Sequence, residues 1–88
     1  VAEPTARALA VGAQQRCGAT WGVGLTGVAG PESHGRHPVG TVFVGIAGPV
    51  DTEVEALLLD GTRWDIRFAA VRATLSRLRE LVEGQDRG

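Results

Sequence analysis

A long amphipathic pattern occupies the C-terminal part of the chain. Its apolar side chains recur at intervals of 4, 3, 4, 3 and 4 residues: Trp64, Phe68, Val71, Leu75, Leu78 and Val82. This spacing matches one face of an α-helix. Thr62 is suited to the N-cap, and Asp65 stands where the acid of a capping box reaches back. We therefore predict a helix that begins after Thr62 and ends at Gly84.

Three segments in the middle of the chain have strand patterns. Residues 21–26 alternate apolar side chains with glycine or threonine, and such glycines leave room for the close approach of a helix or a ligand. Residues 40–47 are almost continuously apolar, which predicts a central strand covered on both faces. Acidic and apolar residues alternate over 53–59, as in a half-exposed strand. The short turn at 48–51 predicts an antiparallel hairpin.

The N-terminal segment predicts a first helix. Pro4 suits a first helical turn, good helix formers follow as far as Arg16, and Gly18 suits the left-handed position after a helix. The expected order is α-β-β-β-α, which indicates an α/β fold. Two helices are few to cover a buried sheet, and the helix pattern begins almost at Val1. We therefore expect residues 1–88 to form a single partial domain.

Composition limits the classes of partner. The chain has 88 residues, 43% of them hydrophobic, and a net charge of −1. This balance argues against nucleic acid or an anionic membrane as the main partner. All nine basic residues are arginine, so no lysine of this chain can act as a general base. The single Cys17 excludes an internal disulfide and fits a reducing cytoplasm, and no segment has a membrane-spanning or signal-peptide pattern.

The end of the first strand is a candidate ligand site. The strand reaches the hydroxyl of Thr26, and Gly27 and Gly30 follow in a turn. Ligands in open α/β sheets bind outside strand ends, where glycines let backbone N–H groups approach an anion. The plainer interpretation is an ordinary turn.

Arg63 and Arg67 form a second candidate site. They are four residues apart in the first turns of the C-terminal helix. Their mutual repulsion and their position at a positive helix end are unfavourable unless an anion binds between them. The alternative is that Arg63 pairs with Asp60 and Arg67 is solvated.

Other reactive side chains have weaker support. His34 and His37 share a loop, but no third group of ligands is near, so we expect solvent-exposed histidines and no metal site. Ser33 precedes His34, yet a catalytic triad requires spatial geometry that adjacency does not supply. Cys17 has no neighbour that would activate its thiol and is expected to be structural.

Three ordered motifs resemble the CinA C-terminal (PncC-type) family. Residues 25–31 read LTGVAGP, residues 37–42 read HPVGTV, and residues 61–67 read GTRWDIR. The family carries T-G-[IV]-A-G-P, K-P-V-G-T-V and G-D-R-x-x-[VI]-R, and its helix V-S-E-E-V-A-R-A-M-A is similar to residues 1–10. The resemblance covers nearly all of the chain. Thr62 replaces a family Asp, His37 replaces a Lys, and residues 32–36 replace a glycine run.

The resemblance implies a three-layer α/β/α unit with a mixed sheet, represented here by its C-terminal half. It also implies an amidohydrolase that converts nicotinamide mononucleotide to nicotinate mononucleotide and ammonia, without metal or cofactor, in a protein that commonly self-associates. The family's serine nucleophile, in an E-S-C-T-G-G motif, and its lysine align before Val1.

We therefore expect no catalytic residue in this chain, but a set of substrate-binding residues: Thr26, Gly27, Gly30, Arg63 and Arg67. By resemblance Thr26 lines the amide site, and we assign the arginines to phosphate or ribose. Two other interpretations stay open, namely a truncated remnant without catalysis and a small nucleotide- or anion-binding module.

Overall fold

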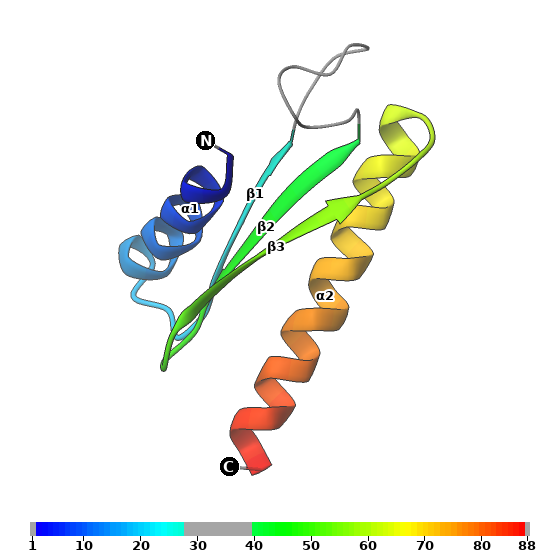
Figure 1. Ribbon diagram of the computed structural model, residues 1–88. Coiled ribbons are helices and arrows are strands. Elements are labelled where there is room, and N and C mark those ends of the chain that lie inside the picture. Colours follow the sequence, from blue (N-terminus) through cyan, green and yellow to red (C-terminus); the bar gives the residue numbers. More distant parts are fainter. Residues whose placement is uncertain (1, 28–39, 88) are drawn as a thin grey trace.

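A computed structural model describes residues 2–27 and 40–87, apart from the side chains of residues 2, 63, 86 and 87. Its elements follow one another in the predicted order (Figure 1): α1 (Ala2–Arg16), β1 (Gly22–Gly27), β2 (Thr41–Ala47), β3 (Thr52–Leu58) and α2 (Arg63–Arg87). The α-β-β-β-α prediction is confirmed, with strand boundaries within one or two residues of those expected. None of the described helices is long and apolar enough to cross a membrane.

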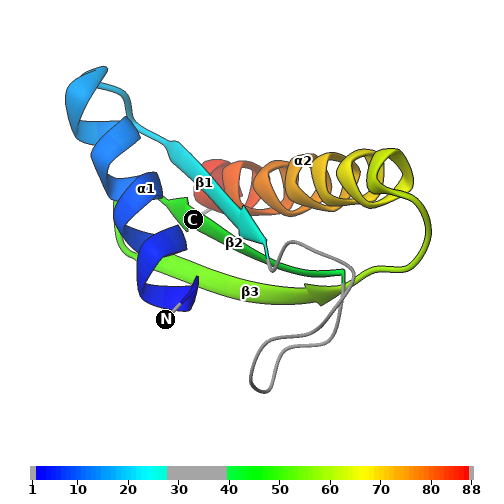
Figure 2. The ribbon, with the colours of Figure 1, turned by 90° about the horizontal axis from the view of Figure 1, so that it is seen from above.

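The elements form three layers. The sheet has the order β1-β2-β3, and both pairings are antiparallel. α1 covers one face of the sheet and α2 covers the other, as the view from above shows (Figure 2). The predicted α/β/α layering is therefore present. The parallel strand that a mixed sheet also requires is not among the three strands of the described residues.

α1 packs so closely on the sheet that glycine is required beneath it. Ala6 and Ala10 of α1 are fully buried. A Cβ built on Gly24 would lie 2.5 Å from the Cβ of Leu9, and one built on Gly45 would lie 2.5 Å from the carbonyl oxygen of Ala6. The glycines of 21–26 thus make room for a helix, which settles the choice between a helix and a ligand at this face.

The opposite face of the sheet carries the hydrophobic core. Val42, Val44 and Ile46 of β2 pack there against Ala70 of α2. Every residue of β2 is buried, as predicted for a central strand. The small Ala70 lets the helix approach the sheet, and the buried hydroxyl of Thr74 has a partner because it donates a hydrogen bond to the Ala70 carbonyl at 2.7 Å.

α2 begins as predicted and ends later than predicted. The backbone N–H of Asp65 donates to the Thr62 hydroxyl at 3.2 Å, and the N–H of Thr62 donates to the Asp65 carboxylate at 2.9 Å. These two bonds form the capping box. The expected end at Gly84 is wrong, because the helix continues to Arg87. Gly84 has no positive φ, and the Arg79–Glu83 ion pair at 3.3 Å ties the preceding turns together.

Candidate functional site

One end of the sheet gathers segments that are distant in sequence. The register pairs Gly27 with Val42, and Thr41 with Leu58. The end of β1, the start of β2 and the end of β3 therefore lie side by side. α2 begins at this same end, at the top of Figure 1. The strand-end motif and the first turns of α2, which are about forty residues apart in sequence, are thus brought to one edge of the sheet.

Thr26 lies on the α1 side of that edge. It pairs with Phe43 and is half-buried. Side chains alternate between the two faces of a strand, and Gly24, two residues earlier, lies under α1. The Thr26 hydroxyl therefore lies on the face of the sheet that α1 covers, two residues beyond Gly24, where α1 contacts the strand.

Gly27 differs from the glycines under α1. It is exposed and has no positive φ. A Cβ built there would first meet the Thr41 carbonyl oxygen at 3.6 Å, an ordinary contact distance. The described structure therefore gives no steric reason for glycine at this position. Gly30, Ser33, His34 and His37 lie outside the described residues, so their predicted roles stay predictions.

Arg67 is exposed on the first turns of α2. Its guanidinium carbon lies 5.6 Å from the centre of the Trp64 ring, within cation–π distance. The Trp64 and Phe68 rings are 6.2 Å apart and tilted by 30°. No ion pair involves Arg67 within the part of the chain that the structure describes. No described carboxylate therefore neutralises the charge of Arg67. This agrees both with a solvated Arg67 and with an Arg67 that binds an anion.

The carboxylate nearest in sequence to Arg67 is already engaged. Asp65 accepts the Thr62 backbone N–H, and this bond, followed by the Thr62 hydroxyl contact, lowers the pKa of Asp65 below its ordinary value. Asp65 therefore stays ionised as a cap. The helical position of Arg63 is described but its side chain is not, so the predicted pairing with Asp60 stays open.

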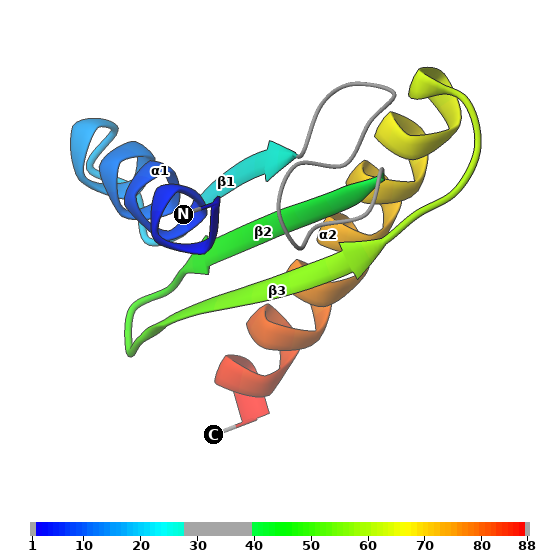
Figure 3. The same ribbon diagram turned by 45° about the horizontal axis from the view of Figure 1, so that its top comes forward.

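The predicted site residues thus share an edge but not a face. Thr26 belongs to the α1 side of the sheet, whereas Arg67 belongs to the helix that covers the other side (Figure 3). Among the described residues no ion pair involves Arg67, so none joins the two sides of this end of the sheet through it. A ligand that touched both would have to reach across the end of the sheet.

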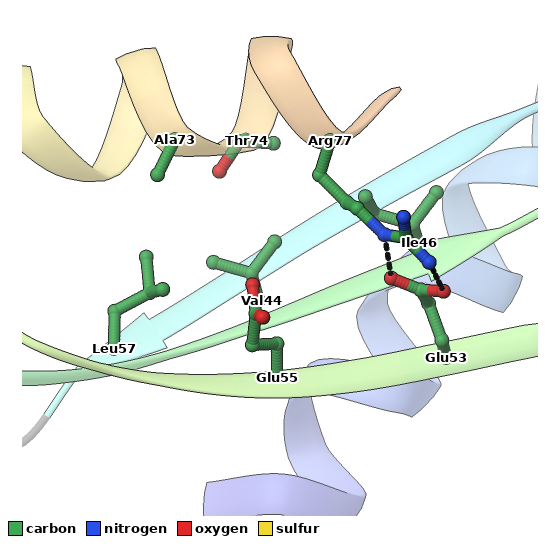
Figure 4. A pocket seen from close by; sticks show the side chains of 8 residues that line it. All are labelled: Val44, Ile46, Glu53, Glu55, Leu57, Ala73, Thr74 and Arg77. Atoms are coloured by element: carbon green, nitrogen blue, oxygen red, sulfur yellow. Dashed lines mark hydrogen bonds and ion pairs between the residues drawn. The ribbon is translucent and has the colours of Figure 1, made fainter. Parts of the chain in front are cut away.

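A cleft that the sequence did not indicate lies between β3 and α2 (Figure 4). It is shallow and open to solvent and does not enclose a cavity that could hold a water molecule. At its rim Arg77 Nε and Nη2 each donate to one carboxylate oxygen of Glu53 at 2.8 Å. Arg77 also pairs with Glu80 at 3.0 Å. Glu53 and Arg77 are 24 residues apart, and no local motif marks such a pair.

The bidentate ion pair explains the electrostatics of this cleft. The hydrogen bonds from Arg77, opposed by partial burial and aided by its charge, lower the pKa of Glu53 below the ordinary value of 4.5. The same bonds raise the pKa of Arg77. Both groups hold their charge by pairing with each other, so we assign them to the attachment of α2 to β3 rather than to catalysis.

Metal and thiol chemistry find no support in the described residues. Within 2–27 and 40–87 no three His, Cys, Asp or Glu side chains are placed to hold a metal ion. Cys17 is a free, exposed thiol. It lies at the end of α1, at the edge of the sheet remote from Thr26 (Figure 1).

Comparison with known proteins gives one consistent result. The family model of the CinA C-terminal domain matches residues 1–82. A CinA-like protein of Anaeromyxobacter dehalogenans is 49% identical over 80 residues, which are 90% of this chain and 20% of that protein. One from Frankia casuarinae is 43% identical over 84 residues, 96% of this chain and 19% of that protein. The chain thus spans about a fifth of the length of these curated relatives.

Solved structures match at the level of the fold. The competence damage-inducible protein A of Klebsiella pneumoniae superposes with a TM-score of 0.83 at 27% identity, over 92% of this chain and 51% of that one. A CinA superfamily protein of Escherichia coli gives 0.82 at 29% identity, over 92% and 48%. This chain therefore corresponds to about half of each solved chain.

Proposed function

Because the chain belongs to the CinA C-terminal domain family, we propose that it supplies the substrate-binding wall of a nicotinamide-nucleotide amidohydrolase. The reaction is hydrolysis of the carboxamide of nicotinamide mononucleotide to nicotinate mononucleotide and ammonia. The observation that carries the proposal is the common edge that Thr26, Gly27 and the first turns of α2 share.

The two sides of this edge suit two parts of the substrate. On the strand side, Thr26 offers a hydroxyl. Gly27 has an exposed backbone that a ligand can approach, although no described neighbour requires glycine at this position. On the helix side, Arg67 is an exposed cation without an ion-pair partner in the described residues, close to the positive end of α2. Arginine and a helix N-terminus both favour a phosphate. We assign the amide end to the strand side and the phosphate to the helix side, with Arg63 in the same turn.

Catalysis in this proposal comes from outside the chain. A serine nucleophile needs an adjacent base, and this sequence contains no lysine. The purified chain should therefore release no ammonia from nicotinamide mononucleotide. Release that survives Ser33→Ala would show that the chemistry lies elsewhere in the chain.

Binding can be tested apart from catalysis. We expect nicotinamide mononucleotide, at millimolar concentration, to shift amide NMR resonances at Gly27 and at the start of α2, and nicotinamide riboside, which lacks the phosphate, to bind more weakly. Arg67→Ala should weaken nucleotide binding roughly tenfold or more, because a hydrogen bond to a charged group contributes roughly 1.5–3 kcal/mol.

Arg72→Ala is the matched control, since Arg72 is also exposed on α2 but lies further from the sheet edge. Equal binding of riboside and nucleotide, or equal losses in the two variants, would remove the phosphate site. A phosphate-dependent site that binds inorganic phosphate as tightly as the nucleotide would favour the alternative of a small anion-binding module.

A further inference from the structure

α2 presents an apolar face that the sheet does not cover. Its side chains are well exposed: Trp64 64%, Phe68 62%, Val71 51% and Leu75 59%. We name these four residues the exposed stripe. They are the first four of the apolar series that predicted the helix. Leu78, the fifth member, packs against the core, so the series predicts the helix correctly but its first four members do not mark the face in contact with the sheet.

The sheet-facing side of α2 is a different line of residues. The residues that pack toward the sheet or are buried are Ile66, Ala70, Thr74, Leu78 and Leu81. At 3.6 residues per turn this line lies roughly 120° around the helix from the exposed stripe. α2 therefore has two apolar sides, and only one has a partner within the described residues.

The dimensions of α2 agree with a second partner. The helix has 25 residues and is about 37 Å long, whereas the seven-residue β2 is about 23 Å long. α2 consequently extends past the sheet toward the C-terminus (Figure 1), and the molecule is elongated, with extents of 41 × 21 × 20 Å. The intervals of 4, 3 and 4 in the exposed stripe are those with which one helix packs along another.

The solved relatives indicate what the second partner is. They match 89–92% of this chain with TM-scores of 0.79–0.83, while this chain covers only 47–51% of theirs. Each of those proteins therefore carries about as much polypeptide again beside the matched fold. A contiguous exposed apolar surface marks an interaction site, and in these relatives additional polypeptide is available to cover it.

We propose that the exposed stripe is the docking surface for the complementary half of the CinA C-terminal domain, the half that this chain does not contain, and that a helix of that half lies along it. The proposal rests on the family and the exposed residues, not on amidase activity. It also places the incoming half beside Arg67, which is next to Trp64 and Phe68.

The test is reconstitution from two polypeptides. The chain is mixed with the part of the Anaeromyxobacter dehalogenans CinA C-terminal domain that this chain does not match. We expect a one-to-one complex in sedimentation analysis, and a blue shift of tryptophan fluorescence that Trp64→Phe abolishes. Phe68→Glu and Val71→Glu should each weaken association about tenfold or more, because charge would replace apolar contacts at the interface.

Matched controls come from exposed apolar residues elsewhere. Val50 and Leu58 are 78% and 74% exposed, so Val50→Glu and Leu58→Glu should leave association unchanged. Circular dichroism of each variant alone verifies that it folds. We expect each to fold, because all four substituted side chains are exposed. Association that survives both stripe substitutions, absence of a complex, or a stripe-dependent homodimer of this chain in place of the complex would each overturn the proposal. None of these readouts requires substrate, so failure here is distinguishable from failure of the amidase proposal.

Discussion

At the scale of single residues, similar amino acids in this chain have different reasons for their positions. Gly24 and Gly45 are required by the backbone and Cβ atoms of α1, which lie within 2.5 Å of where their own Cβ atoms would be. Gly27 has no such neighbour. The sequence alone does not separate them, because all three glycines occur in strand-like patterns. The difference is therefore a direct test of how α1 sits on the sheet.

Gly45→Ala should destabilise the fold, whereas Gly27→Ala should not. A methyl group at 45 meets the Ala6 backbone, so α1 must shift, and overpacking of this kind typically costs about 1–3 kcal/mol. At 27 the nearest atom is 3.6 Å away, and we expect a change within about 0.5 kcal/mol, as for most surface substitutions. Urea unfolding measures both free energies. Equal effects would mean that α1 does not pack as described.

At the scale of elements, α2 is held to the sheet by its apolar contact with β2 and by the ion pair of Arg77 with Glu53 of β3. Ala70 and Thr74 are buried in this contact, and the Arg77–Glu53 ion pair extends it to the edge strand β3. The side chains of Arg77 and Glu53 are 39% and 34% exposed, so solvent weakens the pair. Its role is best seen in how stability depends on pH.

Stability should fall as the solution becomes acidic, and Glu53→Gln should reduce that dependence. The pKa of Glu53 is lower in the folded state than its ordinary 4.5, so the unfolded chain binds a proton more readily. The stabilisation is therefore complete above about pH 5 and disappears as pH falls through the lowered pKa. Asp65, whose pKa is also lowered, acts in the same direction and should preserve part of the slope.

Urea unfolding at pH 7, 5, 4 and 3 measures this dependence. Glu55→Gln provides the control, because Glu55 lies on the same strand and lines the same cleft but makes no ion pair in the described residues. An unchanged pH dependence in Glu53→Gln would show that the ion pair does not hold α2 in solution.

The sequence was sufficient for features that depend on local spacing. Alternation and turn residues located the three strands, and Thr62 with Asp65 located the start of α2. It was insufficient wherever a distant partner decides. The apolar series of α2 could not indicate which side meets the sheet, because the sheet-facing Ala70, Thr74 and Arg77 are not strongly apolar. Gly84 was misread because a glycine that costs about 1 kcal/mol in a helix need not end it.

The candidate site was predicted in part for the same reason. The motifs identified Thr26, Gly27 and Arg67, and the strand register brings them to one edge. Their distribution over two faces of the sheet has two causes. Thr26 lies two residues after Gly24 and so shares its face, which the sequence could indicate. The face that α2 covers is decided by tertiary packing, which the sequence could not indicate. The arrangement of these candidate residues on two sides of the end of the sheet therefore follows only from the fold.

At the scale of the whole molecule, α1 and the sheet are packed more tightly than α2. α1, β1 and β2 pack tightly through buried alanines and glycines, and β2 is buried throughout. α2 is longer than the sheet and exposes four large side chains on its second side. Segments with few buried contacts open with lower free energy than the core around them. The free energy of local unfolding should therefore be higher for α1 and the sheet than for α2.

Amide hydrogen exchange should show that α2 is less protected than β2 in this chain, and that the complementary half increases the protection of α2. In the isolated chain we expect β2 amides to exchange slowest and the α2 amides beyond Val82 to exchange faster, since the last turns extend past the sheet. If the exposed stripe receives the complementary half, its addition should slow exchange along α2 far more than in α1, because only α2 gains a new buried side. Val71→Glu should prevent that slowing, while Val50→Glu should allow it. Uniform protection of both helices would instead indicate that the added half stabilises the molecule through some surface other than the exposed stripe.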